Sequence, residues 1–218
     1  TSLTRNVHTS FDQALAVNRL KQIAFSLRDY EAAYQYFPFP GFDREGQIAE
    51  RFDACRLSWR VAILPYLDEE ALYRRFKLDE PWDSENNKKL IPLMPQVYAA
   101  RNGAGLKEGH TLIQTFRGPK TLQPRAKIAD IKDGPANTFL VVEGGEGVIW
   151  TKPDDLPFDL GKELPKLGGN LGGDFVAAMC DGTIAYVQRK QVSDATLKLL
   201  IQPNDGTPIP PEWKRGER

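Results

Sequence analysis

The sequence is short of cysteine and histidine. Among its 218 residues it has two cysteines, Cys55 and Cys180, and two histidines, His8 and His110. They form neither a Cys-X-X-Cys pair nor a Cys/His group at the spacing of metal ligands, so we expect no metal site of the zinc type. The two cysteines leave two states open, a disulfide formed in an oxidising compartment and a pair of buried free thiols.

An excess of charge of either sign is also missing. Lys and Arg together number 29, as do Asp and Glu, so the formal net charge is zero. Nucleic-acid binding depends on a clustered excess of basic side chains, and the sequence therefore predicts no nucleic-acid partner. No run approaches the roughly 20 apolar residues that span a membrane, and no signal-peptide pattern is present. We expect a soluble globular chain.

Patterns of catalytic residues are scarce. A nucleophilic scheme with a histidine base would have to use His8 or His110, and neither stands in a Gly-X-Ser-X-Gly context. The acidic pairs at 69–70 and 154–155 are neighbours in sequence, and neighbouring side chains point apart in helices and strands. We therefore expect a protein that is not an enzyme. A hydrolase is kept as a minor hypothesis, after the two given below. Its candidate carboxylates are Asp83, Asp133, Glu143 and Asp181.

Two glycine runs, residues 144–147 and 167–173, lack the Gly-Lys-Ser/Thr and Gly-X-Gly-X-X-Gly patterns of phosphate-binding loops, so we interpret both as turns. We expect no cofactor. Calcium is the weaker alternative, because it prefers oxygen ligands from loops, although no EF-hand spacing is present. The aspartates that would supply such oxygens are Asp154, Asp155, Asp174 and Asp181.

The first 35 residues carry apolar side chains three or four positions apart, which predicts one long helix. This helix should end before Phe37-Pro38-Phe39-Pro40, because a residue before proline avoids helical geometry. The predicted helix is much longer than the usual ~11–12 residues. Its apolar pattern is already under way at Thr1, so we expect the helix to continue upstream of this sequence.

The rest of the chain predicts short helices followed by strands. We expect helices over 69–76, capped by Asp68, and over 85–90, capped by Ser84 and ended by Pro92 and Pro95. Alternating and β-branched residues predict strands near 111–116, 137–142 and 148–150.

The clearest predicted hairpin joins residues 175–180 to 183–187. Asp181-Gly182 would form its tight two-residue turn, because this dipeptide tolerates positive φ angles. A final helix should run from Ser193 or Asp194 to Ile201. The predicted fold is α+β, with a long N-terminal helix on an antiparallel sheet and short extra helices. Residues 1–40 and 41–218 are expected to belong to one domain.

Aromatic residues suggest two places for binding. One is the end of the first helix, where a cluster could be core or a platform for a ligand: Tyr30, Tyr34, Tyr36, Phe37, Phe39 and Phe42. The other is the loop from Trp150 to Gly173, with Trp82 as a second stacking surface. We take Trp82, Asp83, Trp150 and Asp181 as the candidate binding residues, and Asp181 and Gly182 also as turn residues.

Several motifs follow one another in a characteristic order along the chain. They are Asn18-Arg19-Leu20-Lys21-Gln22-Ile23, Ser58-Trp59-Arg60-Val61, Leu64-Pro65-Tyr66-Leu67, Glu80-Pro81-Trp82-Asp83-Ser84, Asp130-Ile131-Lys132-Asp133-Gly134, Glu143, Trp150-Thr151-Lys152-Pro153, Cys180-Asp181-Gly182-Thr183 and Ser193-Asp194-Ala195-Thr196-Leu197. Together, over about residues 18–202, these motifs resemble a large planctomycete family of unknown function with prepilin-type features, also labelled a bacterial solute-binding family.

The resemblance implies the architecture of type IV pilins and of the pseudopilins of secretion systems. It implies a protein of the cell envelope or exterior, held to a membrane by an anchor that precedes Thr1. Its partners would be other proteins of an envelope or filament assembly. The alternative is an extracytoplasmic module that binds a small solute or a glycan.

Overall fold

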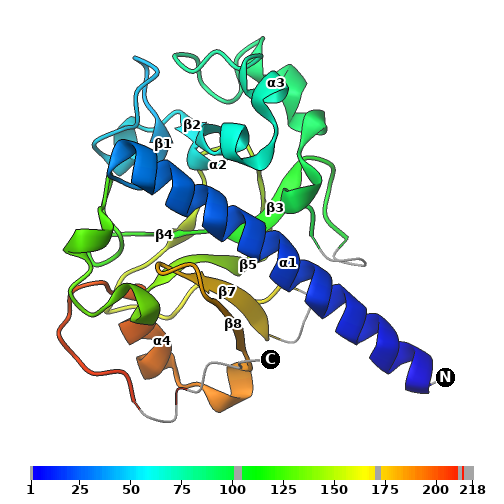
Figure 1. Ribbon diagram of the computed structural model, residues 1–218, viewed down its shortest axis with the longest axis vertical. Coiled ribbons are helices and arrows are strands. Elements are labelled where there is room, and N and C mark those ends of the chain that lie inside the picture. Colours follow the sequence, from blue (N-terminus) through cyan, green and yellow to red (C-terminus); the bar gives the residue numbers. More distant parts are fainter. Residues whose placement is uncertain (1, 101–104, 170–172, 211–212, 214–218) are drawn as a thin grey trace.

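The computed structural model describes residues 2–100, 105–169, 173–210 and 213, and for residues 2–11 it describes the backbone alone. It confirms the predicted α+β class. One long helix, α1, crosses a four-stranded antiparallel sheet, and short helices and strands surround them (Figure 1). In this described part of the chain, no helix combines the length and the apolar character needed to cross a membrane.

Helix α1 spans Ser2–Tyr34 and ends where the prolines predict. Its buried apolar side chains follow the predicted spacing of three and four residues. They are Ala16, Leu20, Ile23, Ala24, Leu27 and Tyr30. After Tyr34 the chain turns through Gln35, which has a φ of 65°. The helix packs against β7 and β8 of the sheet and against a 3-10 helix at Leu64–Leu67.

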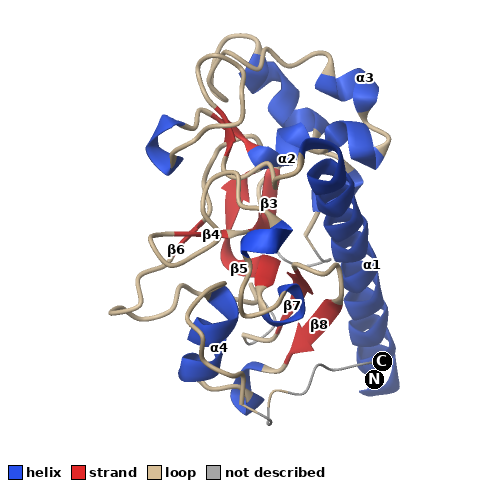
Figure 2. Ribbon diagram, turned by 60° about the vertical axis from the view of Figure 1, so that its left-hand side comes forward, coloured by secondary structure: helices blue, strands red, loops and turns tan. Residues whose placement is uncertain are grey.

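The sheet contains β3 (His110–Gln114), β5 (Phe139–Ile149), β7 (Phe175–Met179) and β8 (Ile184–Val187), in the order β3-β5-β7-β8. Helix α1 covers one face, and α4 (Asp194–Ile201) covers the other (Figure 2). Strand β7 is buried on both faces, so its side chains alternate between two cores. Val176 and Ala178 face the core of α1, whereas Phe175 and Ala177 face the core of α4.

The glycine run at 144–147 is part of a strand, so its interpretation as a turn was wrong. The strands predicted at 137–142 and 148–150 are the two ends of β5, which continues through the run. A Cβ on Gly144 would overlap the side chain of Gln114, and a Cβ on Gly145 would overlap Lys166. The glycines therefore allow close approach to neighbouring segments within a strand.

The strand predicted at 111–116 is interrupted. Strand β3 ends at Gln114, and Phe116–Arg117 form β4, which pairs in parallel with β6 (Leu156–Pro157). Between them the backbone N–H of Thr115 donates to Oδ1 of Asp155, at 3.0 Å, and this bond to a side chain interrupts the strand.

The hairpin prediction is confirmed, but its turn has three residues rather than two. The N–H of Met179 donates to the carbonyl of Thr183 at 2.8 Å, which leaves Cys180, Asp181 and Gly182 in the loop. Gly182 alone among these three has a positive φ, of 90°. A type I turn followed by a left-handed glycine closes such hairpins.

The short elements between residues 41 and 93 form a layer of short segments above the sheet in Figure 1. They include β1 (Gly41–Phe42), β2 (Leu57–Ser58), α2 (Trp59–Ala62) and α3 (Glu70–Tyr73). Further 3-10 helices span Phe52–Ala54, Asn87–Leu93, Gln96–Tyr98, Ile128–Asp130, Pro135–Asn137 and Arg189–Gln191.

The two short helices were predicted less well than the final one. Asp68 ends the preceding 3-10 helix with a φ of 60°, so it does not cap the helix predicted at 69–76, which shrinks to α3. The second is a 3-10 helix that contains Pro92 instead of ending there. Ser193 caps α4 as predicted, because its side chain accepts from the N–H of Thr196.

Candidate functional site

A buried ion pair joins the layer of short segments to the sheet. The side chain of Arg60 is 0% exposed and that of Asp155 is 5% exposed, and their nitrogen and oxygen atoms Nη2 and Oδ1 are 2.8 Å apart. Arg60 also donates from Nη1 to Oγ of Ser58 and from Nε to the carbonyl of Ile113, both at 2.8 Å. The Ser58-Trp59-Arg60 motif therefore ties α2 to strand β3.

Further donors complete the shell of Asp155. Nε1 of Trp59 donates to its Oδ2 at 3.2 Å, and the N–H of Thr115 donates to its Oδ1. Burial raises the pKa of the Asp155 carboxyl, and the positive charge of Arg60 opposes that rise. Because both carboxylate oxygens accept bonds from within the fold, this network holds elements together and does not present an open acid or base.

The candidate stacking residue Trp150 lies in the core. It is 0% exposed, its ring stacks on Tyr98 at 5.8 Å between centroids, and the edge contact with Phe76 is 5.7 Å. Its Nε1 donates to the carbonyl of Ile91 at 2.9 Å. A ring packed in this way offers no surface to a ligand.

The other candidate residues lie in separate parts of the molecule. Trp82 is partly buried, with Nζ of Lys152 5.8 Å from its ring centroid, and Asp83 beside it is exposed. Asp181 lies in the β7–β8 loop, next to the start of β5, whereas Trp150 follows the end of β5. The 11 residues of β5 extend about 30 Å. The structure does not bring Asp181 and Trp150 into one site.

The candidate calcium ligands already accept internal bonds. Asp181 accepts from the N–H of Thr183, and Asp174 accepts from the N–H of Arg189. Asp154 pairs with Lys152 at 3.0 Å. Among the residues that the structure describes, no three His, Cys, Asp or Glu side chains are grouped so that they could hold a metal ion.

Carboxylates considered for hydrolysis support the backbone. Glu143, which is buried, accepts the N–H of Val176 at 2.9 Å. Asp133 accepts the N–H groups of Asp205 and Gly206, at 2.7 and 3.0 Å, and so fixes the segment that follows α4. Nδ1 of His110 lies 3.0 Å from the carbonyl oxygen of Glu108. The side chain of His8 lies outside the described residues.

The second glycine run is bound along β5. The N–H groups of Gly168 and Gly169 donate to the carbonyls of Glu143 and Gly144, at 2.9 and 3.0 Å. These two N–H groups are therefore engaged and do not form an anion cradle. Residues 170–172 of the same run lie outside the described residues. Cys55 and Cys180 are both free thiols.

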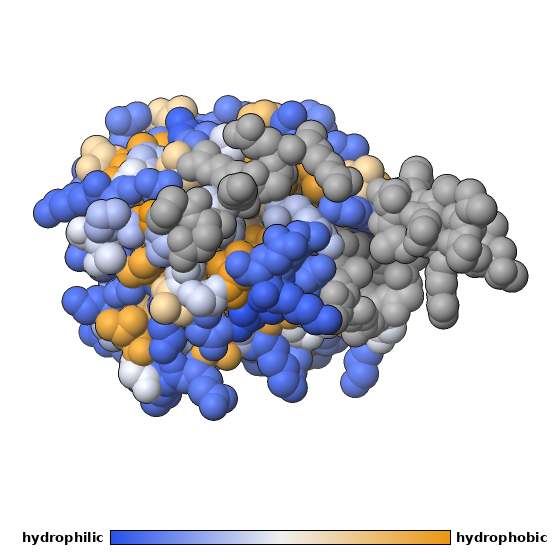
Figure 3. Space-filling view, turned by 90° about the horizontal axis from the view of Figure 1, so that it is seen from below, coloured by the Kyte–Doolittle hydropathy of each residue, from blue (hydrophilic) through white to orange (hydrophobic). Residues whose placement is uncertain are grey.

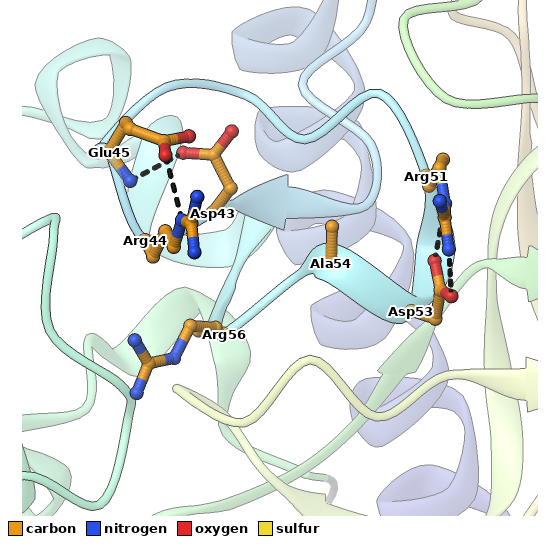
Figure 4. A pocket seen from close by; sticks show the side chains of 7 residues that line it. All are labelled: Asp43, Arg44, Glu45, Arg51, Asp53, Ala54 and Arg56. Carbon is orange, nitrogen blue, oxygen red and sulfur yellow. Dashed lines mark hydrogen bonds and ion pairs between the residues drawn. The ribbon is translucent and has the colours of Figure 1, made fainter.

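A hollow of about 400 Å³ lies in the segment 43–56, above the sheet. Figure 4 shows its charged lining, in which Arg44 pairs with Glu45 and Arg51 pairs with Asp53. The lining comprises Asp43, Arg44, Glu45, Arg51, Asp53, Ala54 and Arg56. Three acids balance three bases here, so the charge of the hollow favours neither anions nor cations.

A group of tyrosines, of which only Tyr30 is buried, lies at the C-terminal end of α1. It is made of Tyr30, Tyr34, Tyr36, Tyr66 and Tyr73, five of the seven tyrosines in the chain, and is called the tyrosine cluster below. Tyr34 is 53% exposed. Sequence reasoning missed Tyr66 and Tyr73, which lie about 30 or more residues further along the chain and carry no local signal. The three phenylalanines predicted with the cluster are buried in the core.

The uncovered face of α1 over residues 12–34 mixes polar and apolar residues. Its exposed residues are Ala14, Asn18, Lys21, Gln22, Phe25, Asp29, Ala32, Ala33 and Tyr34, of which Phe25 is 52% exposed. On the coloured surface seen from below, hydrophobic residues form small areas between hydrophilic ones (Figure 3). The N-terminal end of α1 extends beyond the edge of the sheet (Figure 1).

Comparison with known proteins relates part of the chain to a family. No curated protein and no solved structure is significantly similar to the chain. Residues 16–122 match the sequence profile of the family SBP_bac_10, described as a protein of unknown function (DUF1559). The match supports this family label for the segment that carries the buried face of α1, the Ser58-Trp59-Arg60 motif and β3.

Proposed function

We propose that the protein is a non-enzymatic, pseudopilin-like component of the cell envelope or surface, which contacts other proteins through α1. The observation that carries the proposal is that the N-terminal end of α1 extends beyond the edge of the sheet (Figure 1). Within residues 12–34 the first buried side chain is Ala16. Residues 2–15 precede it, a length of about 20 Å at 1.5 Å per residue.

A helical segment of this length is marginally stable by itself in water. Packing against another protein would stabilise it, because most helical stability in proteins comes from such contacts. The proposal includes an anchor that precedes this sequence and a location outside the cytoplasm. The engagement of Asp133, Glu143 and Asp155 in internal bonds supports a role without catalysis.

Site-specific photo-cross-linking tests the proposal in cells that produce the full-length protein. A photoreactive amino acid replaces Asn18 or Phe25, both exposed on α1, and replaces Leu160, exposed at 47%, as the matched control. We expect discrete protein adducts from the two α1 positions and few from Leu160. Equal adduct patterns from all three positions would contradict a contact through α1.

A second candidate function is the binding of a small solute or glycan. The buried position of Trp150 argues against a site in the loop from 150 to 173, and the tyrosine cluster is the observation that favours this alternative. A thermal-shift panel of sugars and metabolites tests it. Stabilisation by a panel member that is lost in Tyr34→Leu would support the alternative, and an unchanged melting temperature across the panel would exclude it.

A further inference from the structure

The tyrosine cluster has Tyr30 at its centre. The ring of Tyr30 stacks on Tyr34 with centroids 4.4 Å apart, and it makes edge contacts with Tyr36 at 6.3 Å and Tyr66 at 5.9 Å. Tyr30 itself is 6% exposed, whereas Tyr34 is 53% exposed. A buried ring thus supports an exposed one, which fixes the face that Tyr34 presents to solvent.

The cluster joins three segments that lie apart in the sequence. Tyr66 and Tyr73 come from the 3-10 helix at Leu64–Leu67 and from α3, and Oγ of Ser26 in α1 donates to the carbonyl of Tyr66 at 2.9 Å. Burial raises the pKa of the Tyr30, Tyr66 and Tyr73 hydroxyls. These three rings therefore stay uncharged at neutral pH and keep electron-rich faces.

One cation already lies over this cluster. The guanidinium carbon of Arg125 is 5.6 Å from the ring centroid of Tyr36. Arg125 is held there by the carbonyl of Ile48 and by the carboxylate of Glu50 at 2.7 Å. The fold thus uses the ring of Tyr36 as a cation acceptor, at a distance typical of cation–π contacts.

Two carboxylates act on tyrosines of the cluster. Besides burial, the negative charge of Asp29 raises the pKa of the Tyr66 hydroxyl. In the same way, the negative charge of Glu70 raises the pKa of the Tyr73 hydroxyl. The run Asp68-Glu69-Glu70 lies between the two tyrosines in the sequence. Arg74 pairs with Glu70 at 2.9 Å and offsets one of these charges. The negative charge of Asp29 beside Tyr66 favours a positive ligand over a neutral or negative one.

We propose that Tyr34, Tyr66 and Tyr73, with the carboxylate of Asp29, bind an alkylammonium cation. Such a group is carried by free quaternary ammonium compounds and by lysine side chains of proteins, and both place a polarised C–H or N–H surface on an aromatic face. The site can bind a cation whether or not α1 contacts another protein, so it does not depend on the proposed function.

Titration with choline and with its neutral isostere 3,3-dimethylbutan-1-ol tests the site, with the aromatic signals followed by NMR. We expect saturable shifts of the Tyr34 ring signals and an affinity for choline about fivefold or more above that for the isostere, as one or two cation–π contacts provide. N-acetyl-lysine amide and N-acetyl-norleucine amide repeat the comparison. Tighter binding of choline would indicate a free ligand, and tighter binding of lysine would indicate a protein partner.

Three variants locate the site. Tyr34→Leu should weaken choline binding by about fivefold and Asp29→Asn by about threefold. Phe25→Leu removes another exposed aromatic ring of α1 and should leave the affinity unchanged. Circular dichroism would verify that each variant is folded. Equal affinity for choline and its isostere, an absence of saturable shifts, or a loss in Phe25→Leu equal to that in Tyr34→Leu would overturn the proposal. Photo-cross-linking from α1 would be unaffected by that result.

Discussion

Replacement of Arg60 by methionine tests the buried ion pair. The change keeps an unbranched side chain but removes four hydrogen bonds, to Asp155, Ser58, Ile113 and Asp154. It leaves the Asp155 carboxylate buried without its cation, which typically costs about 3–5 kcal/mol. Because one kcal/mol shifts the melting temperature of a chain of this size by about 2–4 °C, we expect a fall of roughly 6–20 °C.

Urea and thermal unfolding followed by circular dichroism would measure this loss. Arg74→Met is the matched control, because Arg74 pairs with Glu70 on the surface and its side chain is 75% exposed. Exposed pairs of this kind contribute about 0.3–0.5 kcal/mol. The control should therefore unfold almost as the wild type does.

The double variant Arg60→Met with Asp155→Leu separates the ion pair from packing. It removes both charges at once, so it should recover much of the stability that Arg60→Met loses. Two results would refute the reasoning about an uncompensated buried charge. One is a loss of less than about 1 kcal/mol in the free energy of unfolding of Arg60→Met. The other is a double variant whose loss equals the sum of the losses in Arg60→Met and Asp155→Leu alone.

Three further predictions concern the core, the hairpin and alkaline pH. Trp150→Ala should lower the free energy of unfolding in urea by about 3–5 kcal/mol, because the Trp150 side chain is fully buried. Trp82→Ala should lower it clearly less, because Trp82 is only partly buried; equal losses would contradict this difference. Gly182→Ala should lower the free energy of unfolding by about 1 kcal/mol or more, because alanine is strained at a φ of 90°, and Thr183→Ala should lower it less. A Gly182→Ala variant as stable as the wild type would argue against the three-residue turn. Burial raises the pKa of Cys55 to about 12 and raises that of Tyr30, so the fold keeps these groups protonated after the unfolded chain ionises. Stability should therefore be complete below about pH 8.5 and fall as pH rises toward 12; a flat profile over this range would contradict the sign.

The elements with strong local patterns were predictable from the sequence. The three- and four-residue spacing of apolar side chains fixed the buried face of α1, and Ser193 marked the start of α4. Asp181-Gly182 marked the hairpin, although the number of loop residues depends on which cross-strand pair closes the ladder, here Met179 and Thr183. That choice depends on tertiary packing.

Contacts between distant residues were not predictable. Nothing near Arg60 indicates that Asp155 will be its partner 95 residues away, and Tyr66 and Tyr73 join the cluster only once the fold is complete. The glycines of β5 were misassigned because glycine signals a turn locally. Their role depends on Gln114 and Lys166, which approach them from other segments.

Hydroxyl-radical footprinting of Phe25 tests the central proposal, contact with other proteins through α1, most directly. The ring is 52% exposed in the isolated chain, and Leu160, at 47%, serves as an internal reference far from α1 in sequence. We predict that labelling of Phe25 falls at least about threefold in native envelope fractions relative to the isolated protein, while labelling of Leu160 stays constant. Equal labelling of Phe25 in both preparations would contradict a protein contact on the exposed face of α1.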